Sequence, residues 1–259
     1  MASRAERGTS FGAVAADYDR LRPTPPDDAI GWLLPSRCEV AVDLAAGTGL
    51  LSRVLARKVD RVVAIELDER MAAVLRARSA DVHVIRGVAE ALPLADASVD
   101  AVLVSSAWHW FDTERAVPEL GRVLRDGGRL GVIWNGANPE VEWIRELRHR
   151  RSLQTDAAQT DAAQRNRPRS RSQTPLPETG VFGNASRTRF DSTRTMAADD
   201  LVDMLATYSA VITATEDDRA AELARVRTVL GRLFPGAAEI HIPMTAWCWH
   251  ADRVPRASR

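Results

Sequence analysis

VAVDLAAGTGLLSRVLA, residues 40–56, is the stretch that decides the fold. An apolar run leads into a turn that contains Gly47 and Gly49, and an apolar pattern at helical spacing follows. Glycines at such a turn let the backbone pass close to a ligand, and the start of the helix offers free N–H donors. The stretch therefore predicts a strand, a ligand-binding loop and a helix, in that order.

Further apolar runs repeat this pattern along the chain. The expected strands are CEVAVDL (38–44), DRVVAIEL (60–67), DVHVIRG (81–87), VDAVLVSS (99–106) and GRLGVIWN (128–135). Most are nearly continuous in aliphatic residues, which is typical of parallel strands buried on both faces. Helical patterns lie between them, and Asp126-Gly127-Gly128 is expected to stop one helix and turn the chain into the fifth strand. Repeated strand–helix units predict a doubly wound α/β sheet.

The flanking segments are less regular. Helices are expected near residues 27–34, 141–150 and 223–234, and a final strand over residues 238–253, where Pro243 favours an edge position or a bulge. Residues 154–178 are polar and repeat QTDAA, so a solvated loop is favoured over a phosphate contact for their arginines. The expected segments are an N-terminal helical lid (1–37), a core (38–137), a variable insertion (138–185) and C-terminal helices with a final strand (186–259).

Composition excludes several classes of protein. The formal net charge of zero argues against a nucleic-acid binder. The two cysteines provide neither a disulfide framework nor a zinc site, and no metal is expected. No apolar run is long enough to cross a membrane, and the first residues lack the apolar stretch of a signal peptide. We therefore expect a cytoplasmic protein without a membrane partner. The chain does not determine the oligomeric state.

Two cofactor classes fit the glycine loop. Glu66 ends the second expected strand 17 residues after Gly49, near the spacing at which a carboxylate binds a ribose diol. A dinucleotide site requires G-x-G-x-x-G/A, but here the third small position is Ser52. Asp43, at the end of the first strand, is poorly placed beside a pyrophosphate and well placed for a positively charged group. The electrostatics favour S-adenosylmethionine, whose amino-acid part carries such a group.

The sequence also resembles a known family. VDLAAGTG is similar to motif I, D-x-G-x-G-x-G, of class I S-adenosylmethionine-dependent methyltransferases. VVAIELDERM, GVAEALPLADASVDAV and ELGRVLRDGGRLGVIWN resemble the later motifs in order. FGAVAADYDRLRP resembles the N-terminal segment of the type-11 subgroup, which includes enzymes similar to trans-aconitate methyltransferase. The resemblance covers roughly residues 10–137 and implies a Rossmann-like, seven-stranded sheet with S-adenosylmethionine as cofactor.

The resemblance also implies roles for individual residues. Asp43 would orient the methionine ammonium group and Glu66 would bind the ribose. Ala45 replaces a common glycine, which is expected to weaken binding only slightly if its φ stays negative. Val88 replaces an aspartate that contacts adenine in many members, so that contact is expected from Glu90, from the backbone of Ala89, or from nothing. The implied cofactor contacts are Asp43, Ala45, Gly47, Gly49, Glu66, Leu67, Val88, Ala89, Glu90 and Ser105.

SSAWHWFD, residues 105–112, follows the fourth strand at the carboxyl edge of the sheet, where open α/β folds bind ligands. We expect this stretch to form a wall of the acceptor site rather than a core plug. At least one of Trp108, His109 and Trp110 should line the acceptor side, and another should pack under the next helix. Trp108 and Trp110 are the expected wall residues, with Tyr18 and Arg22 in a lid. His109 is the candidate general base, although a carboxylate acceptor would need none.

The expected function is methyl transfer from S-adenosylmethionine to a small-molecule acceptor by direct displacement, with the acceptor a carboxylate, a hydroxyl or an activated carbon. Catalysis would come from holding the acceptor in line and excluding water. The sequence leaves two alternatives to methyl transfer open: a protein that binds S-adenosylmethionine without turnover, and a nicotinamide-dependent oxidoreductase.

Overall fold

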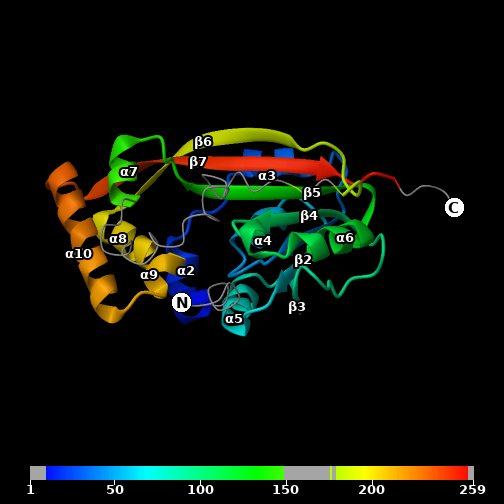
Figure 1. Ribbon diagram of the computed structural model, residues 1–259, viewed down its shortest axis with the longest axis horizontal. Coiled ribbons are helices and arrows are strands. Elements are labelled where there is room, and N and C mark those ends of the chain that lie inside the picture. The colour runs from blue at the N-terminus through cyan, green and yellow to red at the C-terminus, as the bar shows by residue number, and fades with distance from the viewer. Residues whose placement is uncertain (1–9, 149–175, 177–178, 256–259) are drawn as a thin grey trace, which may run out of the picture. The chain divides into compact units, whose positions relative to one another are not determined.

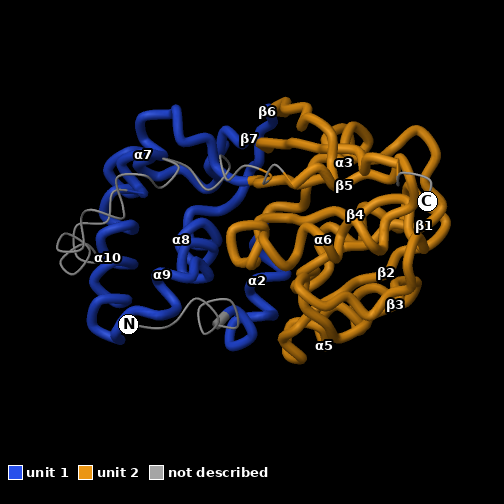
Figure 2. The backbone as a smooth tube through the Cα atoms, turned by 45° about the vertical axis from the view of Figure 1, so that its right-hand side comes forward, with its two compact units in different colours: residues 1–22, 136–169, 191–245 blue, residues 23–135, 170–190, 246–259 orange. Residues whose placement is uncertain are grey.

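The computed structural model describes residues 10–148, 176 and 179–255, which fall into two compact units (Figures 1 and 2). Unit 1 comprises residues 1–22, 136–169 and 191–245, and unit 2 comprises residues 23–135, 170–190 and 246–259. Each unit is therefore discontinuous in sequence, whereas the expected segments were consecutive. The 154–178 repeat and its arginines lie outside the described residues, apart from Leu176.

The sheet has seven strands in the order β3-β2-β1-β4-β5-β7-β6 (Figure 1). The pairs β1–β2, β1–β4, β2–β3 and β4–β5 are parallel, with Val42 opposite Val63 on one side and Val102 on the other. This confirms the predicted α/β fold. The strands are β1 (Val40–Leu44), β2 (Arg61–Glu66), β3 (Val82–Arg86), β4 (Val99–Ser105), β5 (Leu124–Ala137), β6 (Ser186–Ala197) and β7 (Glu239–Asp252).

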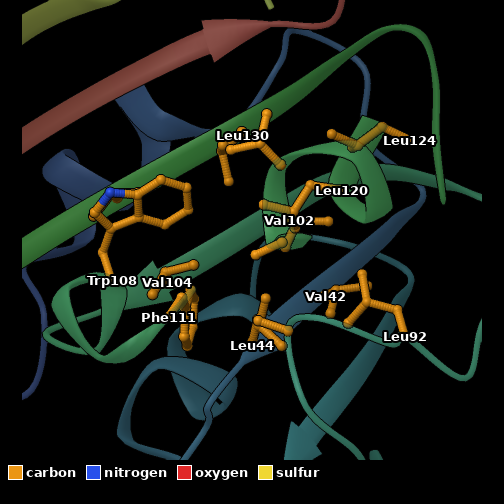
Figure 3. Close-up of a cluster of buried hydrophobic side chains, with 14 of the residues drawn as sticks. Val42, Leu44, Leu92, Val102, Val104, Trp108, Phe111, Leu120, Leu124 and Leu130 are labelled. Carbon is orange, nitrogen blue, oxygen red and sulfur yellow. The ribbon is translucent and has the colours of Figure 1, made fainter. Parts of the chain in front are cut away.

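Helices of unit 2 cover both faces of its part of the sheet. One face packs Val42, Leu44 and Val102 against α6, and Figure 3 shows Leu120 of that helix above the strands. The other face packs Ala41 and Leu103 with the helices on the opposite side. Buried aliphatic residues on both faces explain the nearly continuous apolar runs. The helical elements are α3 (Asp27–Leu33), α4 (Leu50–Leu55), α5 (Glu69–Arg78), η2 (Trp108–Trp110) and α6 (Thr113–Val123).

Unit 1 has a core of its own, built from apolar side chains that include Leu21, Leu201, Leu230 and Ile242. The predicted helices near residues 141–150 and 223–234 are confirmed as α7 and α10. Thr215 caps α10 by accepting a hydrogen bond from the Asp218 N–H at 3.2 Å. The helical elements are η1 (Ser10–Val14), α2 (Ala15–Leu21), α7 (Glu142–Arg148), α8 (Ala198–Ala206), α9 (Ser209–Ile212) and α10 (Glu216–Leu233).

Two local expectations are corrected, and one strand was not predicted. The Asp126–Gly128 turn lies inside β5, at a register shift between Val99 and Ala101 of β4, and not before the strand. The last strand, β7, is not an edge strand, because β6 lies beyond it; of the two alternatives for Pro243, the bulge stays a prediction. The sequence pattern did not predict β6, whose residues are mostly exposed. A polar edge strand lacks the apolar alternation by which strands are recognised.

Candidate functional site

The loop after β1 is built from left-handed backbone. Ala45, Gly47 and Gly49 have φ values of +56°, +59° and +86°, and Gly49 is the N-cap of α4. The expectation that Ala45 keeps a negative φ is therefore wrong. The tight reversal between β1 and α4 imposes the glycine conformation on it, and a residue with a Cβ adopts that conformation at a cost. Ala46 donates its N–H to the Ile65 carbonyl at 3.1 Å, which ties the loop to β2.

The two glycines of this loop are needed for different reasons. A Cβ on Gly49 would lie 2.7 Å from Leu75 Cγ of α5, closer than real Cβ contacts allow. A Cβ on Gly47 would meet only Met71 Cε, at an ordinary 3.4 Å. Gly49 is thus required by the packing of α5 as well as by its φ, while Gly47 is required by its φ alone.

Asp43 is a buried carboxylate at the end of β1, with 1% of its surface exposed. Its Oδ2 accepts a hydrogen bond from the Ser52 hydroxyl at 2.6 Å, and Ser52 itself is fully buried in α4. Its Oδ1 has no hydrogen-bond partner among the described residues. Burial raises the pKa of the Asp43 carboxyl to about 7, against the opposing effect of the hydrogen bonds from Ser52. A buried oxygen without a donor costs free energy, so Asp43 is poised to receive a donor from a ligand.

Glu66 connects the end of β2 to the glycine loop. Its Oε2 accepts the Gly47 N–H at 2.7 Å and its Oε1 accepts the Asp68 N–H at 2.8 Å. Burial raises the pKa of Glu66, and these backbone N–H groups oppose the shift. Each carboxylate oxygen can accept a second hydrogen bond, so the side chain is oriented and still able to bind hydroxyls. Leu67, the next residue, is 42% exposed, unusual for a large apolar side chain in this structure.

The residues after β3 form a short connection. Val88 pairs with Ala91 in an isolated antiparallel bridge. Ala89, which lies between these two residues in the sequence, is buried. Glu90 Oε1 accepts the Asp112 N–H at 2.8 Å, just before α6 begins. Glu90 therefore has a structural partner in unit 2, and its predicted adenine contact stays a prediction.

The aromatic stretch after β4 divides into two core residues, Trp108 and Phe111, and two partly buried rings. Trp108 is fully buried and lies near Phe111, with its ring edge-on to that ring at 5.8 Å (Figure 3). It is also edge-on to the ring of Trp249 at 5.3 Å. Trp108 is therefore the member of the stretch that packs into the core, as expected for one of the three, and its assignment to the acceptor wall is corrected. The Trp108 ring packs into the core because β7 places Trp249 against it, and the sequence does not predict this contact. His109 and Trp110 are partly buried, with rings 4.6 Å apart, and remain the candidates for the acceptor wall.

Ser52 was not predicted as a partner of Asp43. The two residues are nine positions apart, and this spacing does not predict a hydrogen bond between them, because a serine inside a helix usually hydrogen-bonds within its own turn. Ser105 ends β4 and is followed by Ser106, whose φ is +57°. Tyr18 and Arg22 belong to unit 1, where the Arg22 guanidinium lies 4.9 Å from the Tyr18 ring centre.

Within the described residues, no helix is both long and apolar enough to span a bilayer. The same residues hold no group of three or more His, Cys, Asp or Glu side chains arranged to bind a metal ion.

Comparisons with known proteins bear on this arrangement. A family model described as a methyltransferase domain matches residues 42–132. An uncharacterised methyltransferase of Mycobacterium tuberculosis is 40% identical over 229 residues, which is 88% of each chain. A malonyl-[acyl-carrier protein] O-methyltransferase of Methylococcus capsulatus is 38% identical over 135 residues, 48% of this chain and 49% of the other. The solved structure of a proposed type II methyltransferase of Anaeromyxobacter dehalogenans has a TM-score of 0.66 at 25% identity, covering 91% of this chain and 99% of that one.

Proposed function

Because this chain belongs to the class I S-adenosylmethionine-dependent methyltransferases, we propose that it transfers a methyl group to a small-molecule acceptor by direct displacement. The family membership sets aside the alternative of a nicotinamide-dependent oxidoreductase. The narrower likeness to trans-aconitate methyltransferases stays a prediction.

The observation that carries the cofactor assignment is the unpartnered Oδ1 of buried Asp43. An ammonium group would satisfy this oxygen and favour the ionised carboxylate, whose pKa burial has raised. Glu66, already oriented by two backbone N–H groups, supports hydrogen bonds to a vicinal diol. Exposed Leu67 supplies an apolar surface beside that carboxylate, suited to an adenine ring. The residues present thus fit S-adenosylmethionine.

S-adenosylmethionine, when bound, supplies a methyl group activated by the sulfonium charge. The chain's own contribution would be to hold the acceptor in line with that methyl and to exclude water. His109 and Trp110, which are partly buried with tilted rings 4.6 Å apart, support a wall that excludes water. His109 would in addition accept a proton from a hydroxyl acceptor, whereas a carboxylate acceptor is already ionised at neutral pH.

Calorimetric and thermal titrations with S-adenosylmethionine and S-adenosylhomocysteine test the cofactor part of the proposal. Both ligands should raise the melting temperature of the full chain, since binding to the folded state alone stabilises it by mass action. Asp43→Ala should weaken binding sharply, while Asp96→Ala, at an exposed carboxylate of the same unit, should leave it unchanged. No stabilisation at millimolar ligand would refute the proposal, and wild-type affinity in Asp43→Ala would remove Asp43 from the site.

A screen of carboxylates, phenols, alcohols and activated carbon acids, with product identified by mass spectrometry, tests the transfer itself. Cofactor affinity without methylation of any acceptor would favour the alternative of binding without turnover. His109→Asn separates the two roles of the histidine. A base role predicts loss of the maximal rate with a changed pH profile, and a wall role predicts a raised KM at an unchanged pH profile.

A further inference from the structure

Unit 1 contains an arginine that is fixed in place by neutral partners. Arg22 follows the last residue of α2, and its guanidinium carbon lies 4.0 Å from the ring centre of Tyr208 and 4.9 Å from that of Tyr18. Its Nε donates to Thr207 Oγ1 at 2.8 Å and its Nη2 donates to the Thr207 carbonyl at 2.9 Å. These contacts hold the fork of the guanidinium in one orientation, with no counter-charge among them.

A second arginine contacts the same two short segments. Arg194 of β6 donates from Nη1 to the Leu21 carbonyl at 2.6 Å, and the same nitrogen lies 4.0 Å from the sulfur of Met204. Leu21 immediately precedes Arg22, and Met204 lies in α8, which packs beside α2 (Figure 2). The Met204 carbonyl accepts the hydroxyl of Thr207, which is the residue that holds Arg22. The chain therefore brings both guanidinium groups into one neighbourhood.

Neither arginine forms an ion pair with a carboxylate in the part of the chain that the structure describes. Arginines of similar burial elsewhere do form such pairs, as Arg122 does with Glu119 and Arg225 with Glu222. The carboxylate whose charge acts on Arg194 is that of Asp200, but its Oδ1 accepts from the exposed Arg20 at 2.6 Å.

Partial burial without a counter-ion is unfavourable for a cation. Burial lowers the pKa of Arg194, and the charges of Asp200 and Tyr208 oppose this shift. An anion bound by both guanidinium groups would offset this cost of burial.

The two side chains retain donors for such an anion. Nη1 of Arg22, and Nε and Nη2 of Arg194, have no hydrogen-bond partner within the described residues. We propose that Arg22 and Arg194 form a binding site in unit 1 for a small dianion that carries carboxylate or phosphate oxygens. Guanidinium forks match the paired oxygens of both groups. The proposal goes beyond methyl transfer, because the site needs no methyl donor in order to bind.

Calorimetric titration of the full chain with succinate and, separately, with inorganic phosphate tests the site, at an ionic strength held constant with sodium chloride. At least one probe should bind saturably, and the probe that binds more tightly identifies the oxygen group. Arg194→Gln should weaken that binding roughly tenfold or more, the usual effect of losing a charge-assisted hydrogen bond. Arg194→Lys keeps the charge without the fork and should bind with intermediate affinity.

Arg232→Gln is the matched control, because Arg232 is exposed, lies in α10 of the same unit and pairs with Glu146, which contacts neither Arg22 nor Arg194. Its affinity for the probe should stay within about twofold of wild type, since screened surface charges contribute little. Circular dichroism melting confirms that each variant is folded, and Arg22→Lys provides a second, independent variant. The proposal is overturned if neither probe binds saturably, if Arg194→Gln and Arg22→Lys bind like wild type, or if Arg232→Gln weakens binding as much as Arg194→Gln.

Discussion

Ala45 is the residue whose backbone conformation disagrees most clearly with its side chain. It has a φ of +56° in the loop between β1 and α4, beside two glycines that adopt the same conformation without strain. Left-handed backbone costs a residue with a Cβ about 1–2 kcal/mol, and glycine avoids that cost. Ala45→Gly should therefore relieve strain in the ligand-free protein.

Two losses oppose this gain. Glycine increases the conformational entropy of the unfolded chain, which costs about 0.4–1 kcal/mol. The methyl group of Ala45 is partly buried against the apolar cluster of β1 and α6. Its removal costs about 0.4 kcal/mol, half the value for a fully buried methylene. At the midpoints of these ranges, Ala45→Gly should stabilise the protein by about 0.4 kcal/mol.

Ala46→Gly is the matched control for this prediction. Ala46 is the next residue in the loop, is also partly buried against an apolar cluster, and does not have a positive φ. Ala46→Gly has the same two costs, chain entropy and the lost methyl group, without relief of strain. It should therefore destabilise the protein by about 1 kcal/mol. The two glycine variants should thus differ by about 1.5 kcal/mol, the value of the strain alone.

Urea unfolding of the ligand-free wild type and both variants measures this difference. The transitions should have similar slopes, with the Ala45→Gly midpoint at or above that of wild type and the Ala46→Gly midpoint below it. Equal destabilisation by the two substitutions would refute the reasoning, because it would mean that the conformation of Ala45 stores no strain.

Three further predictions concern the same loop and its partners. The pKa of Asp43 is about 7 in the folded protein and about 3.9 in an unfolded chain, so its stability contribution is present in acid and lost as pH rises from about 4 to about 7. Asp43→Asn should flatten this dependence in urea midpoints measured across that window, and an unchanged profile would contradict the assignment. Glu66→Gln should destabilise the ligand-free protein by about 1–3 kcal/mol, since an amide cannot accept backbone N–H groups such as that of Gly47 on both sides. Thermal melting should show this loss, and a wild-type melting temperature would count against it. Gly49→Ala should destabilise the protein more than Gly47→Ala, because only the Cβ at residue 49 meets Leu75 Cγ at 2.7 Å. Gly49→Ala should therefore lower the free energy of unfolding by less in a Leu75→Ala background than in the wild type. Equal unfolding midpoints for the two single variants would exclude the steric explanation.

Local sequence patterns predicted much of the fold because the information lies within short stretches. Five apolar runs predicted β1 to β5, since parallel strands buried on both faces need aliphatic residues nearly throughout. The glycine pair predicted the loop before α4, because left-handed backbone favours glycine. β6 was not predicted, because a mostly exposed edge strand carries neither an apolar run nor a clear alternation. The order of β5, β7 and β6 depends on pairing between distant segments, which no local pattern records.

The sequence alone determined the α/β class, the loop after the first strand and the acidic residues Asp43 and Glu66 at the ends of neighbouring strands, because chain order and periodicity suffice for these features. Only the tertiary structure decided their surroundings. It buried Asp43 against Ser52, packed Trp108 under Trp249, and brought Arg194 to the residue that precedes Arg22. These contacts join residues far apart in the chain, and burial and charge balance depend on which distant side chains meet. The pKa of a carboxylate, the role of a tryptophan and the counter-charge of an arginine are therefore properties of the fold.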